Sequence, residues 1–360
     1  MVILPAIIRN ILIVGMLCAL LPACLTDPEI KLPYEGYTPV QKNDGWEIST
    51  PLAEGFDADA ITAVYREMYS EDLYPAMHSL LIVRNGKLVA EAYCRDKNDL
   101  HTYHPIQSAT KSITSLLTGI AIDQGLIDSV EMPVYHFIPE YFDSDVRKRE
   151  ITIHHVLTME TGLEFDNDTH TTELYYGTGS SLEYVLHKRL VFLPGSDWYY
   201  GDGNPQVISG IIQKTSGKTE EAFAAEFLFR PLGIKNYRWD QHADGLTFGA
   251  VGLWLIPRDM AKIGRLMQQN GIWEGVQIVS ADWIARSTIL QSTHHDYGYY
   301  WYPMDEPGAF YAQGHGGQLI YVVQRLDLVV VITADPYSNM AALASNFEVL
   351  FHDIVRAVNQ

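Results

Sequence analysis

The chain has 360 residues, of which 47% are hydrophobic and 19% charged, and its formal net charge at pH 7 is -19. A chain of this length and composition can bury a large core, so we expect one large domain or two interleaved ones. An acidic surface repels phosphate backbones, which excludes nucleic acid as a partner.

The first 23 residues are expected to direct export. Residues 1–23 carry one positive charge, Arg9, and residues 11–21 form an apolar run that is followed by small residues. This pattern is typical of a signal peptide, and the run is too short and wrongly flanked for a membrane span.

Residues 21–24, LPAC, resemble the lipobox of bacterial lipoproteins, in which the cysteine is lipidated and becomes the mature N-terminus. Ordinary cleavage after Ala23 is the alternative. Lipidation of Cys24 would give an exported, periplasm-facing protein with a lipid anchor in the membrane. Leu25 stands where inner-membrane lipoproteins commonly carry aspartate, which favours the outer membrane.

Residues 24–50 are rich in proline, glycine and polar residues, and this composition predicts a tether to a globular domain over residues 51–360. The chain has three cysteines, two of them in the signal region. With Cys24 lipidated, Cys94 has no cysteine to pair with, so the core must supply the stability.

Two pairs of apolar runs predict β-hairpins. Residues 78–94 turn at Asn85-Gly86, which is a strong type I′ signal, and residues 316–335 turn at residues 325–327. Helical spacing marks residues 257–271 and 339–360, and a long middle is dominated by helical patterns. The predicted fold class is α/β (α+β), with a central antiparallel sheet flanked by helices and a mostly helical second region.

Ser108 precedes Lys111 by three residues at the head of an apolar helix, so both side chains lie on one helix face. Lys111 could take the serine proton only when neutral, and burial together with the helix dipole is expected to lower its pKa. The alternative is a capping serine beside a solvated lysine. The apolar residues that follow favour a buried lysine, which is rare unless paired or functional.

Two later stretches add candidate site residues. The first places Trp198, Tyr199 and Tyr200 after a Pro-Gly turn, in LPGSDWYYGDGNPQ. The second, QGHGGQLIYVV, places Gly-His-Gly-Gly at the start of a strand. Glycines there let a substrate approach the backbone closely.

These three motifs, in this order, resemble those of the serine β-lactamase and penicillin-binding-protein superfamily. The resemblance is to the class C-like branch, which also holds esterases, D-amino-acid peptidases and 6-aminohexanoate-dimer hydrolases. It covers most of residues 50–360 and includes ITIHHVLTMETGLEFD and GLWLIPRDMAKIGRL. The resemblance implies a β-lactamase/transpeptidase-like fold and a serine hydrolase that works without metal or organic cofactor.

The resemblance also implies roles for individual residues. Ser108 is the acylated nucleophile, Lys111 accepts its proton, and Tyr200 shares the proton network and passes a proton to the leaving group. The third motif falls on His315, Gly316 and Gly317. The residue after it, Gln318, supplies an oxyanion-hole N–H together with the N–H of Ser108.

Two departures from the family pattern bear on the substrate. Tyr200 is followed by Gly201 and Asp202 in place of Ser-Asn or Ala-Asn, so the substrate-amide contact is made by Asp202, moved to Asn204, or absent. The Lys-Thr pair that grips the carboxylate of β-lactams is replaced by His315 and Gly316.

A small neutral ester or amide is therefore the favoured substrate. The alternatives are a β-lactamase or D-stereospecific peptidase of the same fold, or a non-catalytic envelope lipoprotein that binds peptidoglycan or a partner.

Histidines occur at residues 154–155, at residues 294–295, and as His101 and His104 in HTYH. Adjacent histidines point apart and no His-Glu-x-x-His motif is present, so no metal site is predicted. Tyr299 and Trp301, in an aromatic stretch, are either core or pocket wall.

Overall fold

The computed structural model describes residues 30–305, 308–338 and 340–359. The predicted signal peptide over residues 1–23 and the lipidation candidate Cys24 lie outside the described residues. Within the described part of the chain, no helix combines the length and the hydropathy that crossing a membrane requires.

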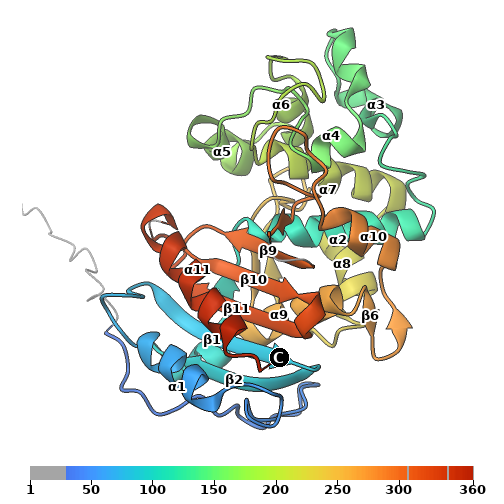
Figure 1. Ribbon diagram of the computed structural model, residues 1–360. Coiled ribbons are helices and arrows are strands. Elements are labelled where there is room, and N and C mark those ends of the chain that lie inside the picture. The colour runs from blue at the N-terminus through green and yellow to red at the C-terminus, as the bar shows by residue number, and fades with distance from the viewer. Residues whose placement is uncertain (1–29, 306–307, 339, 360) are drawn as a thin grey trace, which may run out of the picture. The chain divides into compact units, whose positions relative to one another are not determined.

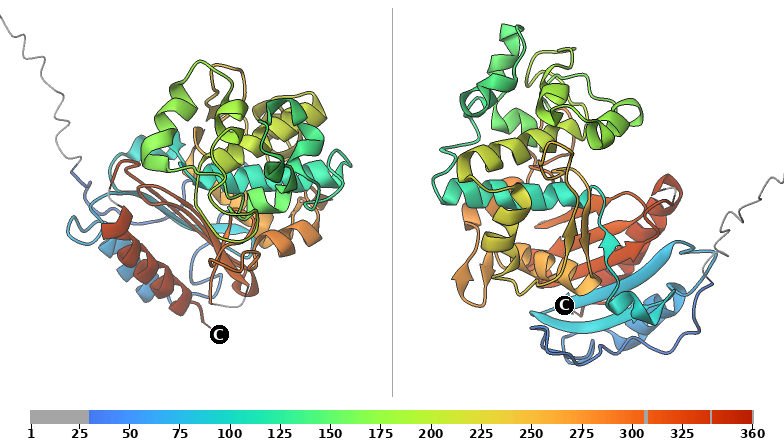
Figure 2. Two further views of the ribbon diagram at one scale, coloured as in Figure 1. Left: turned by 90° about the horizontal axis from the view of Figure 1, so that it is seen from above. Right: turned by 180° about the vertical axis from the view of Figure 1, so that it is seen from behind.

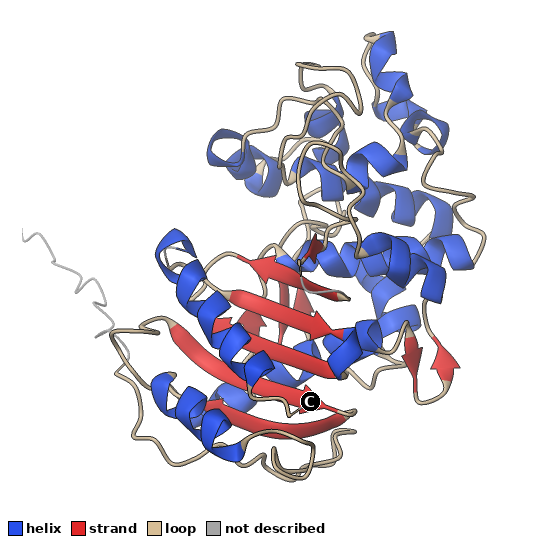
Figure 3. Cartoon of the chain, viewed as in Figure 1, coloured by secondary structure: helices blue, strands red, loops and turns tan. Residues whose placement is uncertain are grey.

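A six-stranded sheet in the order β2-β1-β11-β10-β9-β8 organises residues 31–360 (Figures 1 and 3). All neighbouring strands are antiparallel, and segments from both ends of this part of the chain meet at β1 and β11. The predicted central antiparallel sheet is therefore confirmed. Its strands are β1 (Met77–Arg84), β2 (Lys87–Tyr93), β8 (Tyr302–Pro303), β9 (Ala309–Gly314), β10 (Gln318–Val323) and β11 (Leu328–Ala334).

Both predicted hairpin turns are present. Asn85 and Gly86 join β1 to β2 with φ of 50° and 75°, as a type I′ turn requires. Asp327 joins β10 to β11 with φ of 54°. Asparagine, aspartate and glycine tolerate this left-handed backbone at little cost.

Helices cover both faces of the sheet, so its strands are apolar on both sides (Figure 2). Leu80 and Ile82 of β1 pack on the face that carries α1 and α11, whereas Leu81 and Val83 pack on the opposite face with α2 and α9. This alternation follows from the two-residue period of a strand. The covering helices are α1 (Ala58–Glu67), α2 (Ala109–Asp123), α9 (Pro257–Gln268) and α11 (Met340–Arg356).

A mainly helical region lies beyond α2, as the sequence predicts, and α7 packs against α2 (Figure 3). Its elements are α3 (Val134–Phe137), η2 (Pro139–Tyr141), η3 (Val146–Glu150), α4 (Ile153–Leu157), α5 (Asn167–Tyr176), α6 (Ser181–Leu186), α7 (Gly203–Ser216), α8 (Glu220–Ala224) and η4 (Ala225–Phe229). The remaining elements are η1 (Lys97–Leu100), β3 (His104–Pro105), β4 (Arg238–Trp239), β5 (Leu253–Leu255), β6 (Ile272–Trp273), β7 (Val276–Gln277), α10 (Ala281–Ser287) and η5 (Gln324–Leu326).

Residues 31–50 do not form the predicted tether, because they pack along the edge strand β2. Trp46 is buried in the core, and Ile48 forms a parallel bridge with Leu88. The Arg258 guanidinium binds this segment by donating to the carbonyl of Val40 at 2.6 Å. An edge strand left bare would expose unpaired backbone groups, and this proline- and glycine-rich segment covers it.

Arg258 also forms a buried bidentate pair with Glu91 of β2, at 2.9 and 2.5 Å. Replacing Arg258 by methionine would leave a buried carboxylate without its cation, so we expect Arg258→Met to lower the free energy of unfolding by about 3–5 kcal/mol. Urea denaturation followed by tryptophan fluorescence measures this change. The exposed pair of Arg189 with Glu164 provides the control, since Arg189→Met should cost less than about 1 kcal/mol. Equal losses in the two variants would contradict the expectation.

Candidate active site

Ser108 stands at the N-terminal end of α2, where the backbone is closely constrained. Gln107, directly before it, has φ of 51°, an uncommon conformation for a residue with a side chain. A Cβ at Gly314, the last residue of β9, would lie 2.1 Å from the carbonyl oxygen of Ile106. The end of β9 therefore lies directly against the segment that leads to Ser108, and only glycine fits there.

The ammonium group of Lys111 lies between Ser108 and Asp202. Its Nζ donates to Ser108 Oγ at 2.8 Å and to the carbonyl of Ala250 at 3.2 Å. The same Nζ is 2.8 Å from Asp202 Oδ1 and 4.9 Å from the ring centre of Tyr200. The predicted neighbours Ser108, Lys111 and Tyr200 are thus brought together, and Asp202 joins them.

The expectation that Lys111 has a lowered pKa is wrong. Burial, the largest single influence, does lower it, but the charges and hydrogen bonds of Asp202 and Tyr200 together outweigh burial and raise the pKa above its ordinary value. Lys111 is therefore a cation at neutral pH and cannot itself accept the proton of Ser108. The cause is the carboxylate at position 202, where the family pattern has an amide.

Helix α5 holds Asp202 through two residues that the sequence analysis did not identify. Asn167 donates to Asp202 Oδ1 at 3.1 Å and accepts from the Asp202 backbone N–H at 3.0 Å. Tyr175 donates its hydroxyl to Asp202 Oδ2 at 2.6 Å. Burial and the Asp202 carboxylate hold the pKa of Tyr175 well above its ordinary value, so this hydroxyl remains a donor. No direct signal in the sequence marks these two residues. The sequence indicates only that a carboxylate at position 202, if buried, would need hydrogen-bond donors nearby.

A pocket of about 650 Å³ opens over Ser108. Its wall combines aromatic side chains with polar ones, and among the described residues no lysine or arginine lines it. The pocket therefore offers apolar surface and hydroxyl groups but no full positive charge at its wall. The lining includes Ser108, Asn167, Tyr175, Tyr176, Tyr200, Asp202, Asp240, Phe248, Trp254, Tyr302, Gln313, His315 and Tyr337.

The third motif forms the turn between β9 and β10 beside this pocket. His315 is exposed and lines the pocket, whereas Gly316 and Gly317 have φ of 79° and 101°. Gln318 begins β10 in register with Gly314, and its side-chain amide donates to the carbonyl of Ala334 at 2.6 Å. The glycines serve the turn, and the backbone of residue 318 lies beside the strand end that contacts residues 106–107.

Asn204 is not part of the pocket wall. Its amide oxygen accepts from Thr161 Oγ1 at 2.9 Å and its nitrogen lies 3.1 Å from the Met159 sulfur. Asn204 lies in the first turn of α7 and is buried in the core. It therefore cannot make the substrate-amide contact of the family's asparagine, whose position Asp202 occupies in this chain.

Tyr299 and Trp301 belong to the core and not to the pocket wall. Both are fully buried, the Tyr299 ring stacking on Trp283 and the Trp301 ring meeting Phe310 edge-on. Their neighbour Tyr302 lines the pocket instead.

The arrangement agrees with a comparison against known families. The family model described as Beta-lactamase matches residues 75–349, which is more than half of the chain. The chain belongs to the beta-lactamase family.

Named relatives in this family differ in what they act on. A 6-aminohexanoate-dimer hydrolase of Paenarthrobacter ureafaciens is 23% identical over 283 residues, which cover 70% of this chain and 71% of the relative. A solved structure from Bacillus anthracis, provisionally described as a 6-aminohexanoate-dimer hydrolase, matches at a TM-score of 0.72 and 19% identity over 90% of this chain and 91% of its own. The solved structure of a family VIII carboxylesterase matches at a TM-score of 0.64 and 16% identity, over 83% of this chain and 96% of its own. The two structures establish the β-lactamase/transpeptidase-like fold.

Asp202 raises the pKa of Lys111. Removing the charge of Asp202 should therefore make it easier for the group formed by Ser108, Lys111 and Tyr200 to lose a proton. In Asp202→Asn we expect the pH at half-maximal labelling of Ser108 by a fluorophosphonate to fall by about 1–3 units, the effect of one adjacent charge. The measurement is the labelling rate constant against pH. Asp282→Asn, at an exposed position on α10, should leave the midpoint unchanged. An unchanged or higher midpoint in Asp202→Asn would show that Asp202 does not control this proton.

Proposed function

We propose that this chain is a serine hydrolase that cleaves a neutral ester or amide through an acyl-enzyme on Ser108. The observation that carries the proposal is the contact of Ser108 Oγ with the buried Lys111 Nζ at 2.8 Å, where Ser108 lines a pocket walled in part by aromatic side chains. A capping serine with a solvated lysine would leave the lysine in water, yet the Lys111 side chain is 1% exposed. Relatives that bear the names of hydrolases support the same class of reaction.

The proton path follows from the charge on Lys111. Because Lys111 is a cation, we place the proton relay on the Tyr200 hydroxyl, which takes the proton of Ser108 on its oxygen as it releases its own proton toward the leaving group. Ser108 Oγ then forms a bond to the carbonyl carbon. The bond from the carbonyl carbon to the leaving oxygen or nitrogen then breaks, and the leaving atom keeps the proton that Tyr200 has given it.

The backbone N–H groups of Ser108 and Gln318 are proposed to stabilise the oxyanion of the tetrahedral intermediate. Two contacts of Gly314 support this role. Gly314 touches residues 106–107 and pairs with Gln318, so the backbone before Ser108 and the backbone of Gln318 lie beside one another. Water next attacks the acyl-enzyme and gives up a proton to the same network. The products are a carboxylic acid and an alcohol or amine, and free Ser108 is regenerated.

We expect a fluorophosphonate probe to form a single adduct on wild-type protein, located at Ser108 by mass spectrometry. Ser108→Ala should form none, and Lys111→Ala should react on the order of 10²-fold more slowly because the Ser108 oxygen loses the cation that contacts it at 2.8 Å. Circular dichroism confirms that each variant is folded. A folded wild-type protein that forms no adduct would overturn the hydrolase proposal and favour the non-catalytic binding protein.

The pocket wall bears on the substrate class. A substrate carboxylate would find no lysine or arginine among the described lining residues, and Asp202 and Asp240 contribute negative charge. A charge-assisted hydrogen bond is worth about 1.5–3 kcal/mol, so its absence selects against β-lactams and peptides with a free D-Ala terminus. Aromatic side chains suit an apolar acyl or leaving group.

We therefore expect kcat/KM for a p-nitrophenyl ester or a linear 6-aminohexanoate amide to exceed that for a chromogenic cephalosporin at least about tenfold, the factor that one missing charge-assisted bond implies. His315→Lys, which adds a cation at the pocket wall, should raise the cephalosporin value several-fold. His294→Lys, at an exposed position away from this pocket, is the control. A wild-type protein that prefers the cephalosporin would support the β-lactamase alternative.

A further inference from the structure

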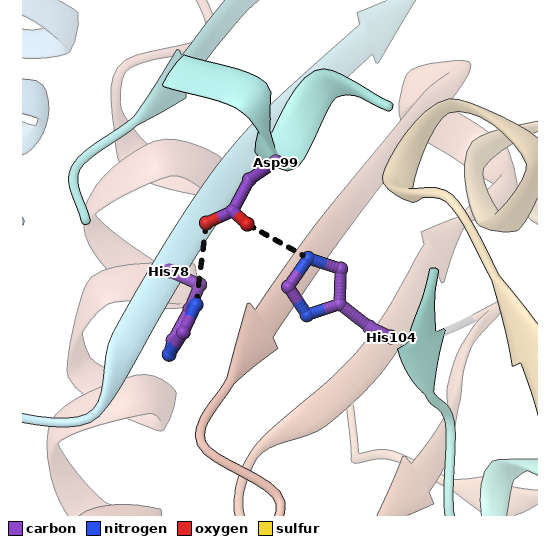
Figure 4. Close-up of side chains that lie close together, drawn as sticks. All are labelled: His78, Asp99 and His104. Atoms are coloured by element: carbon purple, nitrogen blue, oxygen red, sulfur yellow. Dashed lines mark hydrogen bonds and ion pairs between the residues drawn. The ribbon is translucent and has the colours of Figure 1, made fainter. Parts of the chain in front are cut away.

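The side chains of His78, Asp99 and His104 lie close together (Figure 4). None of the three lines the active-site pocket. His78 lies on β1, Asp99 on η1 and His104 on β3, so three separate segments of the chain meet there. One ligand-type atom from each residue lies within 4.8 Å of the other two. The sequence spacing could not show this, because only His104 belongs to the HTYH stretch and its partner there, His101, is exposed.

The carboxylate of Asp99 stands between the two imidazoles. Its Oδ2 is 3.2 Å from His78 Nδ1, and its Oδ1 is 3.6 Å from His104 Nε2. Asp99 and His104 are each about 6% exposed, whereas the His78 side chain is 18% exposed and leaves a route from solvent.

His104 Nε2 is the polar atom that ordinary hydrogen bonding does not explain. This atom is buried, and it has no hydrogen-bond partner. An imidazole nitrogen that faces a carboxylate and a second imidazole is placed as a histidine ligand of a metal ion is placed.

We propose that His78, Asp99 and His104 bind one zinc ion, with the fourth coordination position open to water. Two histidines and one carboxylate form a nitrogen and oxygen donor set that zinc accepts. Zinc ligands about 2.1 Å from the ion at tetrahedral angles lie about 3.4 Å apart. The separations of the imidazole nitrogens from the carboxylate, 3.2 Å to Oδ2 for His78 and 3.6 Å to Oδ1 for His104, fall on either side of that value.

The zinc ion would fasten η1 and β3 to the central sheet. His104 lies four residues before Ser108, and none of the three ligands lines the active-site pocket. The ion would therefore stabilise the segment that leads to the nucleophile without contacting the substrate. This inference does not depend on the proposed hydrolase activity.

The test is zinc binding by the untagged full-length protein, freed of metal by a chelator and dialysed against zinc chloride. Mass spectrometry of the metal content should give one zinc per chain in the wild type and in Ser108→Ala. His78→Gln and His104→Gln should lose it. His101→Gln, an exposed histidine in the same loop, should retain it. Zinc at a hundredfold excess over its Kd should raise Tm by about 4 °C in the wild type and not in the two ligand variants.

A folded wild-type protein that takes up no zinc would overturn the proposal, and the cluster would then be a hydrogen-bonded pair of side chains. Zinc retained by the folded double variant His78→Gln/His104→Gln would also overturn it, by placing the ion elsewhere. Loss of zinc in both ligand variants, with Ser108→Ala unaffected, would establish the site even if no esterase or amidase activity were found.

Discussion

The buried ion pair between Lys111 and Asp202 is the interaction on which the site depends. Lys111 comes from the first turn of α2, which packs on the sheet, and Asp202 caps α7 in the helical region. Neither charge would tolerate burial alone, so each requires the other to stay in place. The pair thereby joins the sheet-bound helix α2 to the helical region beside the half-buried Ser108.

This pair also changes how the family chemistry would run in this chain. An amide at position 202 would leave the lysine pKa to be set largely by burial, which lowers it, whereas the carboxylate keeps Lys111 charged. The charged Nζ lies 4.9 Å from the centre of the Tyr200 ring. The carboxylate is held in turn by donors from α5, so that helix takes part in setting the charge of the site.

Local signals in the sequence predicted the parts of the fold that local chemistry determines. Asn85-Gly86 needs a left-handed turn, Pro257 begins a helix, and Ser108 and Lys111 meet because they are one helical turn apart. Contacts between distant segments could not be read in this way. The composition of residues 31–50 predicts a tether, because their packing on the edge strand β2 depends on a distant segment. No sequence pattern marks Asn167 and Tyr175, because their role depends on where the fold places Asp202.

Several constraints act on the short segment before Ser108. Gln107 adopts a left-handed backbone, which costs on the order of 1–3 kcal/mol and persists only where the surroundings require it. Gly314 of β9 lies in close contact with this segment. The segment is preceded by β3, which pairs with β5, and followed by the N-terminus of α2. In the reaction that we propose, a serine so confined would lose little freedom on attack, because the fold already places it in the pocket wall.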